Sequence, residues 1–96
     1  MNQTTQLTEA QKQVRYQKIS ANGRCEAWNF VVESSWDRGA IQAKLADKEE
    51  SRDYPHFQNR SMAPGASPRI FIDAYIATLN EAIEIIEVQQ VESVAA

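Results

Sequence analysis

Few side chains in this sequence could do acid–base, nucleophilic or metal chemistry, and they are scattered. The chain has one histidine, His56, and one cysteine, Cys25. Glu81, Glu84 and Glu87 recur at every third position, a spacing that places them along one solvated side of a helix. No phosphate-binding loop, paired metal ligands or nucleophile motif accompanies them. The sequence therefore predicts no enzymatic activity, no catalytic residue, no metal and no cofactor.

A second set of side chains has the chemistry of nucleic-acid contacts. Cations bind phosphates, amides bond to base edges, and aromatic rings stack on bases. The candidates lie in the first half of the chain: Arg15, Gln17, Arg24, Asn29, Trp36, Arg38, Gln42 and Lys44. The alternatives are an ordinary solvated surface for the polar residues and core or dimer packing for Trp36.

Charge is distributed unevenly along the chain, which has a net charge of −3. Residues 11–48 hold seven basic and four acidic residues, whereas residues 49–96 hold three basic and eight acidic ones. Such asymmetry can mark a nucleic-acid-binding half. The alternative is that a C-terminal helix carries acidic residues on its solvated side.

Alternation of apolar and polar residues, with turn signals between the runs, predicts several strands. Asn22-Gly23 is a hairpin signal, because both residues tolerate the positive φ of a tight turn. Asp37-Arg38-Gly39 is the second predicted turn. The predicted strands are residues 13–20, 24–34, 40–47 and 70–72.

One helix is predicted after the last strand, from an N-cap at Asp73 to Val88. Its apolar stripe, expected to form the core and a dimer contact, consists of Ile76, Leu79, Ile83 and Ile86. The predicted fold class is α+β, a four-stranded antiparallel sheet with one C-terminal helix. The polar face of this sheet would be left open to a ligand.

Length allows one domain, expected over residues 13–91 between tails at 1–12 and 92–96, with a long loop at 47–68. A domain of this size is only marginally stable alone, and one cysteine cannot form an internal disulfide, which favours a homodimer. No apolar run approaches the ~20 residues that span a bilayer, and no signal peptide is visible. The expectation is a cytoplasmic protein without a membrane partner.

The order of these segments resembles the PUR-type repeat of the Pur-alpha-like single-stranded nucleic-acid-binding family, a whirly-like fold. The resemblance implies a homodimer of one-repeat chains with intertwined helices that binds single-stranded DNA or RNA on curved sheets. It covers residues 13–88 and is carried by residues 16–19, 23–24, 27–33, 37–39, 43–47, 69–72 and 79–86.

The expected function is therefore single-stranded DNA or RNA binding by a homodimer, with a regulatory role. The alternative is a protein-interaction module, or a small antagonist, that engages a protein partner through the acidic helix or through loop 47–68.

Overall fold

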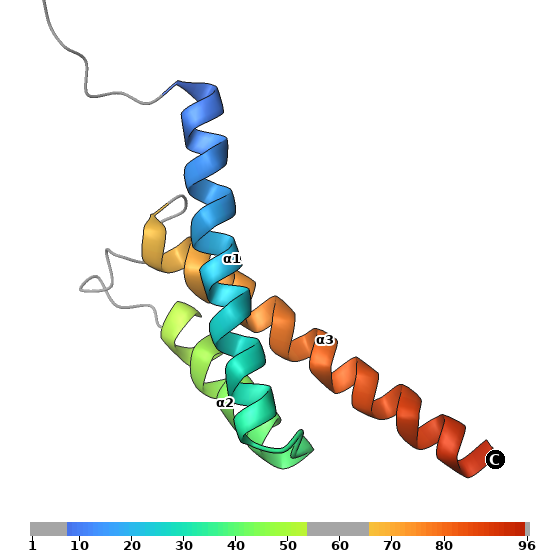
Figure 1. Cartoon of the computed structure of the whole chain (residues 1–96). Coiled ribbons are helices and arrows are strands. Elements are labelled where there is room, and N and C mark those ends of the chain that lie inside the picture. The colour runs from blue at the N-terminus through green and yellow to red at the C-terminus, as the bar shows by residue number, and fades with distance from the viewer. Residues whose placement is uncertain (1–7, 54–65, 96) are drawn as a thin grey trace, which may run out of the picture.

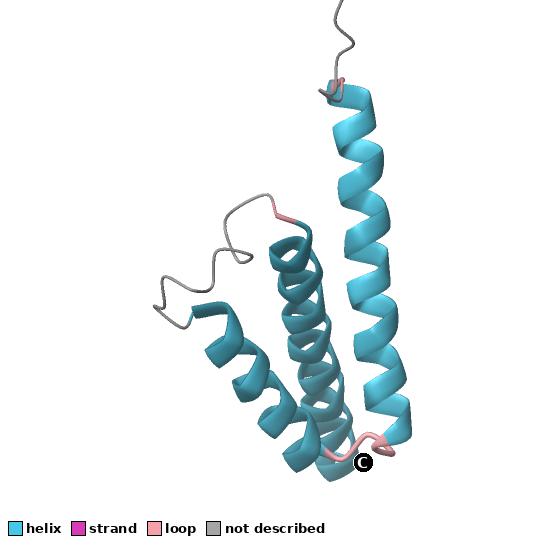
Figure 2. Ribbon diagram, turned by 90° about the vertical axis from the view of Figure 1, so that its left-hand side faces the viewer, coloured by secondary structure: helices cyan, strands magenta, loops and turns pink. Residues whose placement is uncertain are grey.

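The computed structural model describes residues 8–53 and 66–95, which form three helices (Figures 1 and 2). They are α1 (Glu9–Glu33), α2 (Arg38–Asp53) and α3 (Ser67–Ala95). Helix α3 packs against both α1 and α2. The described residues contain no strand, so the predicted four-stranded sheet is wrong.

Helix α1 begins at a capping box. The Thr8 hydroxyl accepts the backbone N–H of Gln11 at 3.1 Å, and the Gln11 side chain accepts the backbone N–H of Thr8 at 2.9 Å. Two backbone donors that have no partner inside the helix are satisfied in this way. The start of α1 is therefore fixed locally, before any packing is considered.

Helices α1 and α3 cross through small residues. Gly23 and Ala27 are buried on α1, and Ala74 and Thr78 are buried on α3. A Cβ atom on Gly23 would lie 2.4 Å from the Phe71 carbonyl oxygen and 3.1 Å from the Ala74 Cβ, so the crossing depends on glycine there. The Thr78 hydroxyl donates to the Ala74 carbonyl at 2.9 Å, which satisfies it without a partner outside α3.

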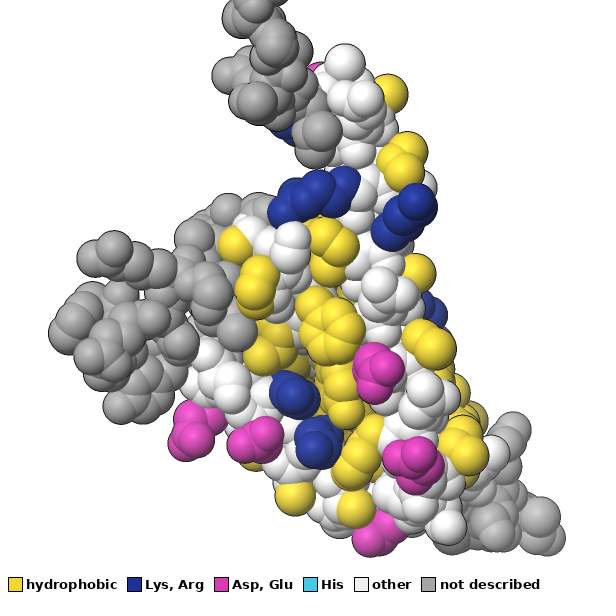
Figure 3. All heavy atoms as spheres, turned by 60° about the vertical axis from the view of Figure 1, so that its left-hand side comes forward, with side chains coloured by type: hydrophobic (Ala, Val, Ile, Leu, Met, Phe, Trp, Pro, Cys, Tyr) yellow, Lys and Arg dark blue, Asp and Glu magenta, His cyan; other side chains and the backbone are white. Residues whose placement is uncertain are grey.

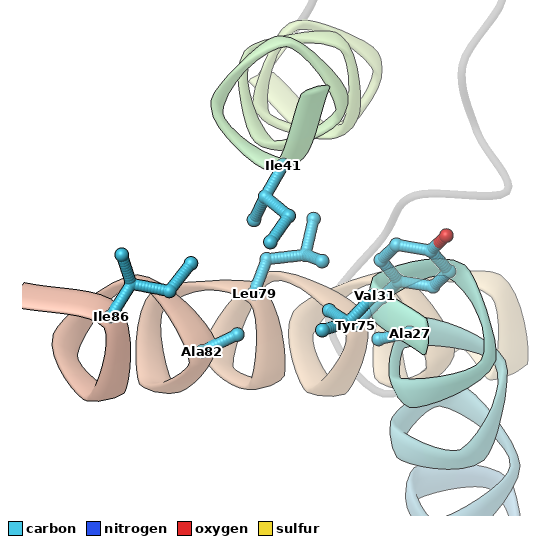
Figure 4. Packing of buried hydrophobic residues seen from close by; sticks show 7 residues of the cluster. All are labelled: Ala27, Val31, Ile41, Tyr75, Leu79, Ala82 and Ile86. Atoms are coloured by element: carbon cyan, nitrogen blue, oxygen red, sulfur yellow. The ribbon is translucent and has the colours of Figure 1, made fainter. Parts of the chain in front are cut away.

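The core lies where all three helices meet, with α3 at its centre (Figure 4). Ile41 is the buried residue of α2 and points towards Leu79 of α3. Both side chains are fully buried. The cluster comprises Ala27, Val31, Ile41, Tyr75, Leu79, Ala82 and Ile86.

The chain reverses between α1 and α2 through two consecutive residues in the left-handed region. Ser35 has φ 57° and Trp36 has φ 58°, values that are uncommon for residues with a side chain. The Trp36 N–H donates to the Val31 carbonyl and the Ser35 N–H donates to the Val32 carbonyl, both at 2.9 Å. These bonds satisfy carbonyls that the end of α1 would otherwise leave free.

Every predicted strand lies in a helix. Residues 13–20 and 24–34 belong to α1 apart from Ser34, which caps it; residues 40–47 belong to α2 and residues 70–72 to α3. Alternation in the second segment is coincidental, because Phe30 packs on the core whereas Val32 is 64% exposed. A strand would have placed both side chains on one face.

The predicted turns and cap are also corrected. Asn22-Gly23 lies within α1, where the glycine serves close packing. The second turn occurs earlier than predicted, and Arg38 already begins α2. Asp73 does not cap a helix; it lies inside α3 and pairs with Arg69, four residues before it, at 3.2 Å.

The predicted helix over 73–88 is confirmed within the longer α3. Ile76, Leu79 and Ile86 are buried, and Ile83 packs partly buried on the core. Of the predicted loop 47–68, the described part is helical except for Ala66, while residues 54–65, including His56, lie outside the described residues. None of the described helices combines the length and apolar character needed to cross a membrane.

Candidate interaction surface

The residues predicted to bind nucleic acid are not brought onto one surface. Four lie on α1, three on α2 and one in the turn between them. Arg15 and Arg24 are two and a half helical turns apart on α1, so they project from opposite sides of it. The sheet face that would have gathered these residues is absent from the described chain.

The four predicted cations each have a partner within the protein. Arg15 donates to the Ser67 hydroxyl at 2.7 Å, Arg24 pairs with Glu81 at 3.8 Å, and Arg38 pairs with Glu87 at 2.5 Å. The Lys44 ammonium lies 4.8 Å from the centre of the Phe30 ring. These cations therefore link α1, α2 and α3 to one another, and nucleic-acid binding remains a prediction.

The other four predicted residues are in varied settings. Gln17 and Gln42 are exposed on α1 and α2. Asn29 is exposed, with its amide nitrogen 4.0 Å from the Cys25 sulfur. Trp36 contacts Trp28 with 5.9 Å between ring centres, and it keeps 39% of its surface exposed. Trp36 is therefore partly a packing residue and partly available to a partner.

A surface that the sequence analysis missed runs along the side of α1 that faces away from α3. Figure 2 shows α1 on the right with both other helices on its left, so no described helix covers its right-hand side. Val14 is 51% exposed and Val32 is 64% exposed, and each lies two and a half helical turns from Gly23, on the side opposite its contact with α3. We call it the outer face of α1 and define it by residues spaced alternately four and three apart: Val14, Lys18, Ala21, Cys25, Trp28 and Val32.

The spacing of the outer face is that of a helix-pairing seam. At 100° per residue, its six members fall within about 80° of the circumference of α1. Gly23 lies on the opposite side, against α3. Helix α1 is therefore anchored along one side and presents an apolar strip with a single charge, Lys18, on the other.

A second apolar surface, the seam between α1 and α2, is closed by lysines. Figure 3 shows hydrophobic side chains between the two helices, with cationic side chains beside them. Lys44 lies over Phe30, and Lys48 lies 4.9 Å from the centre of the Tyr75 ring. These cation–π contacts cover the seam from within the protein, so it is less available to a partner than the outer face.

Tyr75 is the titratable group whose environment in this seam is most unusual. Its side chain is 7% exposed, and burial raises the pKa of the hydroxyl above its ordinary value, with smaller contributions from the negative charges of Glu26 and Glu33. A raised pKa keeps the hydroxyl neutral at physiological pH. Tyr75 therefore packs in the seam as a neutral phenol.

An ion-pair cluster ties the end of α2 to the start of α3. Arg52 donates to the Asp53 carboxylate at 2.7 Å and lies 3.7 Å from Asp73, which also pairs with Arg69. The hydrogen bond from Arg52 lowers the pKa of Asp53. The two arginines and two aspartates of this cluster therefore neutralise one another, and the cluster holds the end of α2 against the start of α3.

The described residues also form a surface hollow, but no cluster of metal ligands. They contain no group of three or more histidine, cysteine or acidic side chains placed to hold a metal ion. A shallow hollow of about 470 Å³ lies along α3 and is lined by glutamates, Ile85, Val88 and Gln89, without a nucleophile.

No family model, curated protein or solved structure matches the chain.

Proposed function

We propose that this protein is a helical protein-interaction module whose binding surface is the outer face of α1. The observation that carries the proposal is the exposure of Val14 and Val32 in line on a helix already anchored along its other side. Covering such an apolar strip removes it from water, at roughly 25 cal/mol per Å² of apolar surface. The proposal differs from engagement through the acidic helix, because Glu81 and Glu87 already pair with arginines of this chain.

Site-specific photocross-linking in the source cells tests the proposal. The full chain carries a benzoyl-phenylalanine probe at Val32 or, as a matched control, at Val88, which is 57% exposed on α3. The Val32 probe should give discrete protein adducts that disappear with Val14→Glu, and the Val88 probe should give few. Equal adducts from the two probes, or adducts unaffected by Val14→Glu, would overturn the proposal.

A second experiment tests nucleic-acid binding with the purified full chain. Anisotropy of a labelled single-stranded oligonucleotide should show no binding that depends on Arg15 and Lys44. Salt-sensitive binding abolished by Arg15→Glu/Lys44→Glu but unchanged by Val14→Glu would favour the nucleic-acid function instead.

A further inference from the structure

The outer face of α1 has a charged flank whose sign reverses along the helix. Arg15 and Lys18 lie on this flank near the N-terminal end, and Glu26 and Glu33 lie on it nearer the C-terminal end. Lys18, Glu26 and Glu33 form no ion pair within the described residues, and Arg15 donates only to the neutral Ser67 hydroxyl. The flank therefore carries cations and anions that have no charged partner within the described part of the chain.

The positions of the outer face are symmetric about the level of Gly23. Each member has a counterpart at the same distance along α1 on the other side of that level. An antiparallel copy of α1 would therefore bring these counterparts face to face. The pairs are Val14 with Val32, Lys18 with Trp28, and Ala21 with Cys25.

We propose that the partner of the outer face is a second copy of this chain, bound antiparallel about a two-fold axis at the level of Gly23. This inference rests on the proposed function and names its partner. Two apolar ends would cover each other, because Val14 of each copy meets Val32 of the other.

Charge selects the antiparallel orientation. An antiparallel pair places Arg15 of each copy beside Glu33 of the other, and Lys18 beside Glu26, so opposite charges meet along the flank. A two-fold parallel pair would place the two flanks on opposite sides of the interface, so these charges would not meet. Only the antiparallel pair therefore gains the attraction between them.

The size of the contact sets its expected strength. From Val14 to Val32 the outer face extends about 27 Å, at 1.5 Å per residue. A contact between two helices of this length lies at the small end of specific interfaces. We therefore expect a closed dimer that dissociates in the micromolar range, rather than a permanent one.

Sedimentation of the full chain over a range of concentrations tests the association. The wild type should dimerise, and Val14→Glu/Val32→Glu should weaken the dimer at least about tenfold, whereas Val88→Glu should not. Circular dichroism should show that all three proteins are folded. A wild type that stays monomeric at hundreds of micromolar, or a dimer unaffected by Val14→Glu/Val32→Glu, would overturn the proposal.

Charge reversal tests the pairing. Arg15→Glu and Glu33→Arg should each weaken the dimer, and the double variant should restore it, because both symmetry-related pairs are then reversed together. A double variant that is weaker than either single variant would contradict the antiparallel register.

Disulfide cross-linking tests the register directly. Wild type, with Cys25 alone, is mixed with the variant Ala21→Cys/Cys25→Ala, and mild oxidation should favour the mixed dimer over either self-dimer. In the antiparallel register two Cys25 residues are offset by about 6 Å along the axis in addition to the helix separation, too far for an easy bridge. Preferential cross-linking of wild type to itself would indicate a parallel pair and overturn the proposal.

The inference and the proposed function fail in different ways. Photo-adducts at Val32 with a different protein, together with a monomeric wild type, would reject self-association and keep the interaction surface. Absence of both adducts and dimer would reject the two together.

Discussion

Gly23 allows α1 and α3 to pass each other at close range. A side chain there would meet the Phe71 carbonyl, which belongs to the backbone of α3 and cannot rotate away. The second helical glycine, Gly39, has room for a methyl group, because an added Cβ would lie in ordinary contact with the Asp37 carboxylate oxygen at 3.9 Å. The two glycines therefore offer a matched comparison of one substitution in two environments.

Gly23→Ala should destabilise the protein by about 1–3 kcal/mol, because the added methyl group forces the two helices apart. Gly39→Ala should instead stabilise it by about 0.4–1 kcal/mol through reduced freedom of the unfolded chain. Urea unfolding of both variants measures these changes. Equal stability of the two would show that the crossing adjusts easily to a methyl group.

Small residues also explain why this crossing could not be predicted from the sequence. Gly23 and Ala27 carry little hydrophobic signal, so the buried side of α1 is inconspicuous. Trp28, Phe30 and Val32 give a strong alternating signal, although Val32 is exposed and only Phe30 and Trp28 pack on the core. The alternation of large residues therefore predicted a strand, although the small residues of the same segment follow the spacing of a buried helix side.

At the scale of the elements, α2 has the weakest attachment to the fold. Ile41 is its buried residue, supported by the partly buried Leu45 and by the pairing of Arg52 with Asp73. Helix α1, in contrast, is fixed to α3 through backbone-level contact at Gly23.

Ile41→Ala should therefore release α2 before the rest of the fold. The expected loss is about 2–5 kcal/mol, with faster hydrogen exchange across Arg38–Asp53 than around Leu79. Gln42→Ala, at the exposed neighbouring position, should change neither quantity appreciably. Uniform acceleration in all three helices would contradict a separate release of α2.

The helix at the end of the chain was predictable, and the reason lies in its composition. Ile76, Leu79 and Ile86 are large, buried and helically spaced, so the pattern and the packing agree. The first turns of α3 were missed, because Ile70-Phe71-Ile72 after Pro68 has the composition of a short strand. Proline is nevertheless compatible with the first turn of a helix, where its missing N–H costs nothing.

For the molecule as a whole, Tyr75 should make stability fall at alkaline pH. Its pKa is raised in the folded state, so its contribution is complete below the unfolded value near 10 and is lost as pH rises beyond it towards the folded value. Tyr75→Phe should lessen the decline between about pH 9 and 11, as measured by urea unfolding. Parallel curves for the two proteins would contradict this coupling.

The candidate interaction surface was only partly visible in the sequence. A homodimer was expected from the size of the chain and from a resemblance that requires a sheet, and the dimer proposed here uses different residues. The alternating spacing of four and three residues from Val14 to Val32 indicates a helix-pairing surface only once α1 is known to be a helix. Which side of a helix faces solvent, however, depends on α3, more than thirty residues away in sequence.

The central position of α3 also has a consequence for synthesis. Helices α1 and α2 make their main packing contacts with α3, which leaves the ribosome after both. Until α3 emerges, the sides of α1 and α2 that it buries lack their main packing partner. The entropy of closing the long chain between α1 and α3 must also be lost before their contacts can stabilise the fold. The nascent chain therefore depends on its final third to fold. A ribosome stalled between α2 and α3 would expose the unpacked apolar sides of the two earlier helices to chaperones and proteases.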